Sequence, residues 1–142
     1  MNVFLDTNVL LDVLARREPF YGAAAAIWTL AEQGKDRGPV HGLISAISFT
    51  NIYYIVCKVR DRRTARQALV LLHATFTPVA CDGRILQLAL DADFPDFEDA
   101  VQYHSALRAR ADCLITRDPH HFPASGLKVL APVEFLAMRS GT

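Results

Sequence analysis

The feature of this sequence that most constrains its fold is an alternation between short apolar segments and longer segments with helical periodicity. Length and apolar content predict buried strands over residues 2–5, 39–44, 77–80, 113–116 and 128–130. Repeated strand–helix units of this size favour parallel pairing, with helices on both faces of the sheet. We therefore expect an α/β fold, namely a three-layer α/β/α sandwich around a central, mainly parallel sheet.

The helices between these strands are predicted from apolar spacing and from capping residues. They are expected over residues 7–16, 20–33, about 62–74 and 97–110, and from Pro132 onward. Ser45 or Ser48 is a candidate N-cap for another helix that runs to about Val59. Asp82 is a candidate N-cap for one that runs to about Leu90.

Composition indicates one core. The chain has 142 residues, of which 51% are hydrophobic and 21% charged, so intrinsic disorder is excluded. The sequence contains neither an internal repeat nor a linker, and residues 1–142 are expected to form a single domain. No apolar run reaches the roughly 18–20 residues that span a bilayer, and the N-terminus does not resemble a signal peptide. We expect a cytoplasmic protein with no membrane partner.

Charge is balanced overall but clustered locally. Lys+Arg and Asp+Glu both number 15, so net charge gives no indication of a polyanionic partner. One basic cluster comprises Lys58, Arg60, Arg62, Arg63 and Arg66. By default it is the solvated junction of two helices. The nearby Tyr53 and Tyr54 leave a nucleic-acid-binding groove open as an alternative.

The candidate site residues lie where predicted strands end, because open parallel sheets bind ligands outside the carboxyl ends of their strands. Asp6 directly follows the first strand, and Asp118 lies just beyond the strand that ends at Thr116. Asp96 and Asp99 stand three residues apart at the start of a helix, which places them on one face of its first turn. These carboxylates are expected to meet at one edge of the sheet.

Clustered carboxylates point to a bound cation, because like charges raise one another's pKa and resist joint ionisation. Oxygen ligands without companion histidines or thiolates suit Mg²⁺ or Mn²⁺ rather than Zn²⁺. The chemistry that such a centre supports is phosphodiester cleavage, in which the metal polarises the phosphate and lowers the pKa of a bound water.

Each candidate also has a structural interpretation. Asp6 can cap a helix, and Asp96 and Asp99 can complement the positive end of another. Asp118 followed by Pro119 is an ordinary turn signal. The pair His120-His121 is a weak metal signal, and without further spaced ligands it is assigned to a loop surface.

Short motifs along nearly the whole chain make a family resemblance recognisable. They are Val3–Asp12, Ile44–Ser48, Asn51–Tyr54, Asp96–Gln102, and Leu114–Asp118 with Phe122. In order and spacing they resemble the motifs of PIN domains, the family of VapC-type toxin ribonucleases. The resemblance implies an α/β/α sandwich and an Mg²⁺- or Mn²⁺-dependent endoribonuclease, often a homodimer inhibited by a small antitoxin.

The resemblance also implies roles for single residues. Asp6 matches the first acidic position of the family, Asp99 the third and Asp118 the fourth. Thr7 and Thr116 match hydroxyl positions that support the site.

Two positions depart from that pattern. Asp96 is an additional acidic candidate, and Asn51 stands in the region where many PIN domains carry a glutamate. An amide oxygen can bind a water, but it removes one negative charge and cannot act as a general base. Metal affinity is therefore expected to be weaker unless Asp96 compensates.

The leading hypothesis is a toxin-like ribonuclease that acts on RNA. Asp6 and Asp99 ligate a first metal, Asp118 and Asp96 help to bind it or a second ion, and an activated water attacks phosphorus in line. The main alternative is a catalytically weak RNA-binding or regulatory module with the PIN fold, in which the basic cluster binds RNA without turnover. A third hypothesis, a structural partner-binding domain, predicts neither metal nor RNA binding.

Overall fold

The computed structural model describes residues 1–35, 38–124 and 126–141, and its elements follow the predicted strand–helix order. In chain order they are β1 (Asn2–Leu5), α1 (Thr7–Leu14), α2 (Tyr21–Gly34), β2 (His41–Ser45), α3 (Ala46–Val59), α4 (Arg62–Thr75), β3 (Thr77–Val79), α5 (Gly83–Asp91), α6 (Phe97–Arg108), β4 (Cys113–Ile115), the 3₁₀ helix η1 (Pro119–His121), β5 (Lys128–Leu130) and α7 (Pro132–Ser140). None of the described helices has the length and hydrophobicity needed to cross a membrane.

The sheet is parallel throughout, as predicted, and its strand order is β3-β2-β1-β4-β5. β1 is the central strand, with Phe4 in register with Leu43 of β2 and with Leu114 of β4. From β1 the chain adds β2 and β3 on one side, and it then crosses to add β4 and β5 on the other. The order therefore reverses between β1 and β4, which is where open parallel sheets form a ligand-binding crevice.

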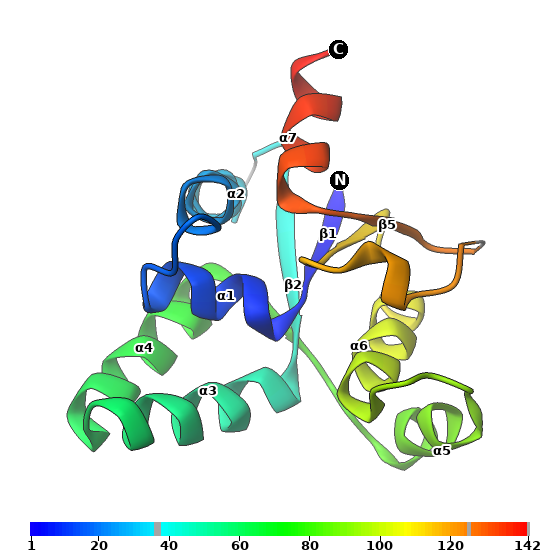
Figure 1. Ribbon diagram of the computed structural model, residues 1–142, viewed down its shortest axis with the longest axis horizontal. Helices are drawn as coiled ribbons and strands as arrows, with labels where there is room; N and C mark the ends of the chain where they lie inside the picture. Colours follow the sequence, from blue (N-terminus) through cyan, green and yellow to red (C-terminus); the bar gives the residue numbers. More distant parts are fainter. Residues whose placement is uncertain (36–37, 125, 142) are drawn as a thin grey trace.

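Helices cover both faces of this sheet, which confirms the three-layer architecture. Val3 and Leu5 of β1 belong to a core cluster that includes Trp28 of α2 and Phe135 of α7. Phe4 points to the opposite face, because successive side chains of a strand alternate, and it packs in a cluster with Tyr103 of α6. Figure 1 shows α1 and α2 on one side of the strands and α6 with α5 on the other.

Several element boundaries differ from the prediction. Helix α1 ends at Leu14 rather than at Arg16, because Arg16 has a φ of 49°, which a right-handed helix cannot contain. Strand β2 begins at His41 rather than at Pro39, because its pairing with β1 begins where His41 lies opposite Asn2. Strand β4 ends at Ile115, so Thr116 is the first residue beyond it.

Two predicted caps are observed. Ser45, rather than Ser48, caps α3 by accepting a hydrogen bond of 3.2 Å from the backbone N–H of Ile47. Asp82 caps α5 by accepting a bond of 3.1 Å from the N–H of Ile85. Ser45 is also the last residue of β2, so α3 leaves directly from the carboxyl edge of the sheet.

Helices α3 and α4 pack together as a pair that extends away from the sheet (Figure 1). The far end of the pair is the turn at Arg60 and Asp61, where Asp61 caps α4 through a bond of 2.7 Å from the N–H of Thr64. Because α3 has 14 residues, this turn lies about 20 Å from the point where α3 leaves the sheet.

Candidate active site

Asp6 and Thr116, which directly follow β1 and β4, contact each other at the crevice between these strands. The backbone N–H of Asp6 donates to the carbonyl of Ile115 over 2.9 Å. The Thr116 hydroxyl donates to Asp6 Oδ2 over 2.8 Å, although the two residues are 110 positions apart. Both side chains are buried, so the pairing of the two strands fixes the position of this carboxylate.

Asp6 occupies the N-cap position of α1, but its side chain makes no capping hydrogen bond. Its second oxygen, Oδ1, instead accepts a bond of 2.9 Å from the side-chain amide of Gln102. Asp6 is only 4% exposed. The structural interpretation of Asp6 as a simple helix cap therefore does not account for its contacts, which connect three separate parts of the chain.

Gln102 on α6 is a supporting residue that the sequence analysis missed. It is fully buried, and its carbonyl oxygen accepts a bond of 3.0 Å from the backbone N–H of Thr7. The Thr7 hydroxyl in turn pairs with that of Ser48 over 2.7 Å. One signal pointed to Gln102, because it lies three residues after Asp99 and so shares a helix face with it.

The first turn of α6 holds three more acidic residues. Asp96 caps this helix, and its Oδ1 accepts a bond of 3.0 Å from the backbone N–H of Asp99. The capping interpretation of Asp96 is thus correct for one of its oxygens. Glu98 and Asp99 follow in the same turn, where negative charge also stabilises the helix N-terminus.

These side chains line one pocket of about 300 Å³, which we call the acidic pocket. Its lining residues are Asp6, Asn8, Pro95, Asp96, Glu98, Asp99, Thr116, Asp118 and His121. All four carboxylates singled out in the sequence are therefore brought together. His121, which was assigned to a loop surface, is exposed but also borders the acidic pocket.

The electrostatics of the acidic pocket oppose full ionisation. Burial raises the pKa of Asp6 above its ordinary value, and the hydrogen bonds from Thr116 and Gln102 offset part of that effect. Burial, followed by the nearby charges of Asp6, Asp96 and Glu98, raises the pKa of Asp99 to about 7. Without a bound cation, part of the Asp99 carboxyl population is therefore protonated at neutral pH.

This donor set suits a hard divalent cation. Carboxylate oxygens are the ligands that such ions prefer, and positive charge would relieve the repulsion that raises the pKa of Asp99. Within the part of the chain that the structure describes, no group of three or more His, Cys, Asp or Glu side chains is already arranged to hold a metal. The carboxylates therefore share a pocket without forming a finished coordination sphere.

Comparison with known proteins identifies the family of this fold. A family model described as PIN domain matches residues 2–120. The chain belongs to the PIN domain family. A search of curated proteins found no match to the sequence.

Three solved structures share the fold of this chain. VapBC2 from Rickettsia felis, bound to a promoter DNA fragment, has a TM-score of 0.65 at 14% identity, covering 92% of this chain and 98% of that one. A toxin–antitoxin complex from Klebsiella pneumoniae has a TM-score of 0.63 at 24% identity, covering 92% and 97%. VapC20 from Mycobacterium tuberculosis, a sarcin–ricin loop cleaving toxin, has a TM-score of 0.62 at 14% identity, covering 79% and 86%.

Two residues of the expected PIN site lie outside the acidic pocket. Thr7 does not line it, but its backbone N–H donates a hydrogen bond to the side-chain carbonyl of Gln102. Asn51 lies on α3 and is also not a lining residue. Glu98 is a lining residue, so α6 brings a glutamate to the pocket, whereas none of the described lining residues comes from α3.

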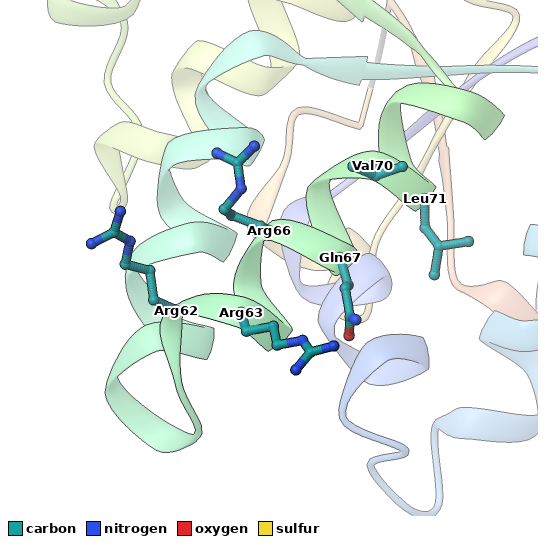
Figure 2. Close-up of a pocket in the computed structure, with 6 residues that line it drawn as sticks. All are labelled: Arg62, Arg63, Arg66, Gln67, Val70 and Leu71. Carbon is teal, nitrogen blue, oxygen red and sulfur yellow. The ribbon is translucent and has the colours of Figure 1, made fainter.

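The basic residues lie elsewhere in the PIN fold. Lys58 and Arg60 are at the end of α3, and the remaining arginines are at the start of α4, at the far end of the helix pair. A second pocket, of about 830 Å³, follows one stripe of α4, and we call it the arginine pocket. Figure 2 shows the side chains that line it, which are Arg62, Arg63, Arg66, Gln67, Val70 and Leu71.

Proposed function

We propose that this PIN domain is a metal-dependent endoribonuclease that hydrolyses RNA phosphodiester bonds and serves as the toxin of a toxin–antitoxin pair. The observation that carries the proposal is the convergence of Asp6, Asp99 and Asp118, from three distant segments, on one pocket at the switch point of the sheet. Membership of the PIN family supports the same reaction class.

Asp6, Asp99 and Asp118 are the residues that would hold Mg²⁺ or Mn²⁺, with Asp96 as a further acidic group. A bound ion supplies polarisation of the phosphate and a water of lowered pKa. Thr116 and Gln102 keep both oxygens of Asp6 oriented through their hydrogen bonds. Hydrolysis adds water across the P–O3′ bond, so the products carry a 5′-phosphate and a 3′-hydroxyl.

The number of carboxyl groups in the acidic pocket favours an active ribonuclease over a catalytically weak RNA-binding module. Five carboxyl groups line it, because Glu98 joins the four that the motifs indicate. The carboxyl group that Asn51 on α3 does not provide is therefore supplied to the pocket by Glu98 on α6.

RNA outside the acidic pocket is proposed to contact the basic cluster. Lys58, Arg60 and the arginines of α4 are all exposed, and positive side chains bind the phosphate backbone without regard to base sequence. Lys58 also lies 5.9 Å from the ring centre of the exposed Tyr54, which offers a base-stacking surface.

A small antitoxin is the proposed protein partner, because two of the similar structures are complexes of this kind. We further propose that residues 1–142 act as one domain, that the active form is a homodimer, and that it works in the cytoplasm on cellular RNA. Size-exclusion chromatography with light scattering tests the dimer, and copurification from the native host tests the antitoxin.

Metal-dependent cleavage is the decisive experiment. Structured and single-stranded RNA are incubated with the protein plus Mg²⁺, plus Mn²⁺ or plus EDTA, and the ends of the products are identified. We expect cleavage with either metal, none with EDTA, recovery when metal is restored, and 5′-phosphate ends. Cleavage that persists in EDTA and leaves a 2′,3′-cyclic phosphate would contradict the proposal.

A further inference from the structure

Arg117 lies between two residues of the acidic pocket, yet its side chain contacts a residue outside it. Its neighbours in the chain are Thr116, which donates to Asp6, and Asp118, which lines the pocket. The guanidinium instead makes a two-pronged contact with Asp12 on α1. Its Nε donates to Oδ2 over 2.7 Å, and a terminal nitrogen contacts Oδ1.

Asp12 is fully buried, and a buried carboxylate is unfavourable unless it is paired. Besides Arg117, the Nε of Arg17 approaches its Oδ1 at 3.4 Å. The guanidinium of Arg117 also stacks over the ring of Phe20 at 4.0 Å. Arg117 is therefore held by a planar charged contact at its edge and by an aromatic ring on its face, which leaves it little rotational freedom.

Asp6, at the N-cap of α1, and Asp12, near its C-terminus, thus contact the same short segment after β4. At the start of the helix, Asp6 accepts the hydroxyl of Thr116. Further along the helix, Asp12 binds Arg117, the next residue in the segment. With two successive residues attached to one rigid helix, the direction in which Asp118 leaves the segment is restricted.

We propose that the Asp12–Arg117 ion pair is a positioning device that holds Thr116 and Asp118 in the geometry needed for cleavage. This inference rests on the proposed function, because it assigns a purpose to the pair within the acidic pocket. Arg117 acts here as a positioning residue and not as a group that touches the substrate.

Arg17 offers a matched control. It contacts the same carboxylate as Arg117, but through one nitrogen, and neither Arg16 nor Glu18 lines the acidic pocket. A lysine keeps positive charge beside Asp12 at either position but cannot form the planar two-pronged contact. Comparing Arg117→Lys with Arg17→Lys thus separates the positioning of Asp118 from the neutralisation of Asp12.

The test combines kinetics with a measurement that needs neither metal nor RNA. Arg117→Lys is expected to lower kcat by about tenfold or more while KM for RNA changes by less than about threefold. Arg17→Lys is expected to leave both nearly unchanged. In the metal-free protein, amide exchange of Thr116 and Asp118 is expected to accelerate in Arg117→Lys and not in Arg17→Lys.

A second variant guards against a general loss of folding. The pair Asp12→Asn with Arg117→Gln replaces the ion pair by a neutral hydrogen bond, and it is expected to recover part of the kcat and of the amide protection that either single change loses. Equal kcat and equal exchange in the two lysine variants would overturn the proposal. A wild-type chain inactive on RNA would overturn the proposed function, and the exchange measurement would still decide the positioning role.

Discussion

The acidic pocket and the arginine pocket carry opposite charge and are built in opposite ways. The acidic pocket collects residues from Asp6 to His121, and its central carboxylate is buried and hydrogen-bonded on both oxygens. The arginine pocket draws all its residues from ten consecutive positions of α4. Its three arginines are exposed, so solvent screens their charges.

The difference indicates two kinds of contribution to function. A buried group with fixed partners contributes through its position, so a small change there should produce a large loss. Exposed side chains on one helix contribute mainly through summed charge, so their loss should be graded and dependent on salt. The following predictions test this contrast, from the largest expected effect to the smallest.

Asp6→Asn is expected to lower the rate of RNA cleavage by at least about 100-fold, because the central carboxylate of the pocket becomes neutral. The fold should persist, since an asparagine can keep hydrogen bonds to Gln102 and Thr116, whose hydroxyl can reverse its role. Cleavage rates and thermal melts measure the two effects. Asp91→Asn is the control, because Asp91 is an exposed residue of α5 that pairs with Gln87. Equal cleavage rates in Asp6→Asn and Asp91→Asn would contradict the idea that the buried carboxylate of the acidic pocket is needed for cleavage.

Gln102→Met is expected to slow cleavage by about tenfold and to shift the acid limb of its pH profile upward. The hydrogen bond from Gln102 lowers the pKa of Asp6, so its removal raises that pKa and the carboxylate ionises only at higher pH. The pH dependence of kcat/KM measures this shift. Gln87→Met on the exposed face of α5 should leave the profile unchanged. A slower enzyme with an unmoved profile would show that Gln102 serves packing alone.

Neutralising the arginine pocket should weaken RNA binding without stopping chemistry. Changing Arg62, Arg63 and Arg66 together to Gln removes three phosphate contacts, so the slope of log affinity against log salt should fall by about 2 for single-stranded RNA. Filter binding over a range of salt gives that slope, and kcat at saturating RNA should stay near the wild-type value. Arg84→Gln on α5 is the comparison, with an expected change close to zero. A large fall in kcat would mean that the arginines act in catalysis.

The smallest expected effect is a change in stability with pH. Because the pKa of Asp99 is about 7 in the folded protein and near 4 when unfolded, its protonated form favours folding. This contribution is complete below about pH 4 and is lost as pH rises through about 7, so the Tm of the metal-free protein should fall over that range.

Asp99→Asn removes this dependence. It should raise the metal-free Tm at pH 8 by a few degrees and weaken Mn²⁺ binding, whereas Mn²⁺ should stabilise the wild-type protein most at that pH. Differential scanning calorimetry with and without Mn²⁺ makes the comparison. A less stable variant with unchanged Mn²⁺ binding would assign Asp99 to the N-terminus of α6 and not to a metal site.

The sequence predicted the fold well because its signals are local. Apolar segments and caps such as Asp82 depend on neighbours a few residues away, and they located the strands and most of the helices. The acidic candidates were also found locally, since Asp6 and Asp118 follow strands whose carboxyl ends must share one edge. Their convergence on one pocket follows from the parallel topology.

The supporting contacts could not be predicted in the same way. Gln102 shares a helix face with Asp99, but only the packing of α6 on the sheet brings its side-chain amide within 2.9 Å of Asp6. Asp12 and Arg117 are 105 positions apart, and neither has a local pattern that identifies its partner. His121 is exposed, as expected, but its position beside the acidic pocket could not be predicted, because tertiary packing sets the path of the chain after β4. The positions of these residues depend on contacts between distant parts of the sequence, which a local hydrophobic pattern cannot reveal.

The place of β1 at the centre of the sheet has a consequence for the order of biosynthesis. A growing chain contains Asp6 long before the neighbour that holds its side chain, because Thr116 directly follows β4 and lies 110 positions further along. Until Thr116 has been synthesised, Asp6 lacks one of the two side-chain hydrogen bonds that orient its carboxylate. If the proposed ribonuclease activity holds, a nascent chain that has not yet reached β4 therefore lacks an assembled site with which to cleave the transcript that encodes it.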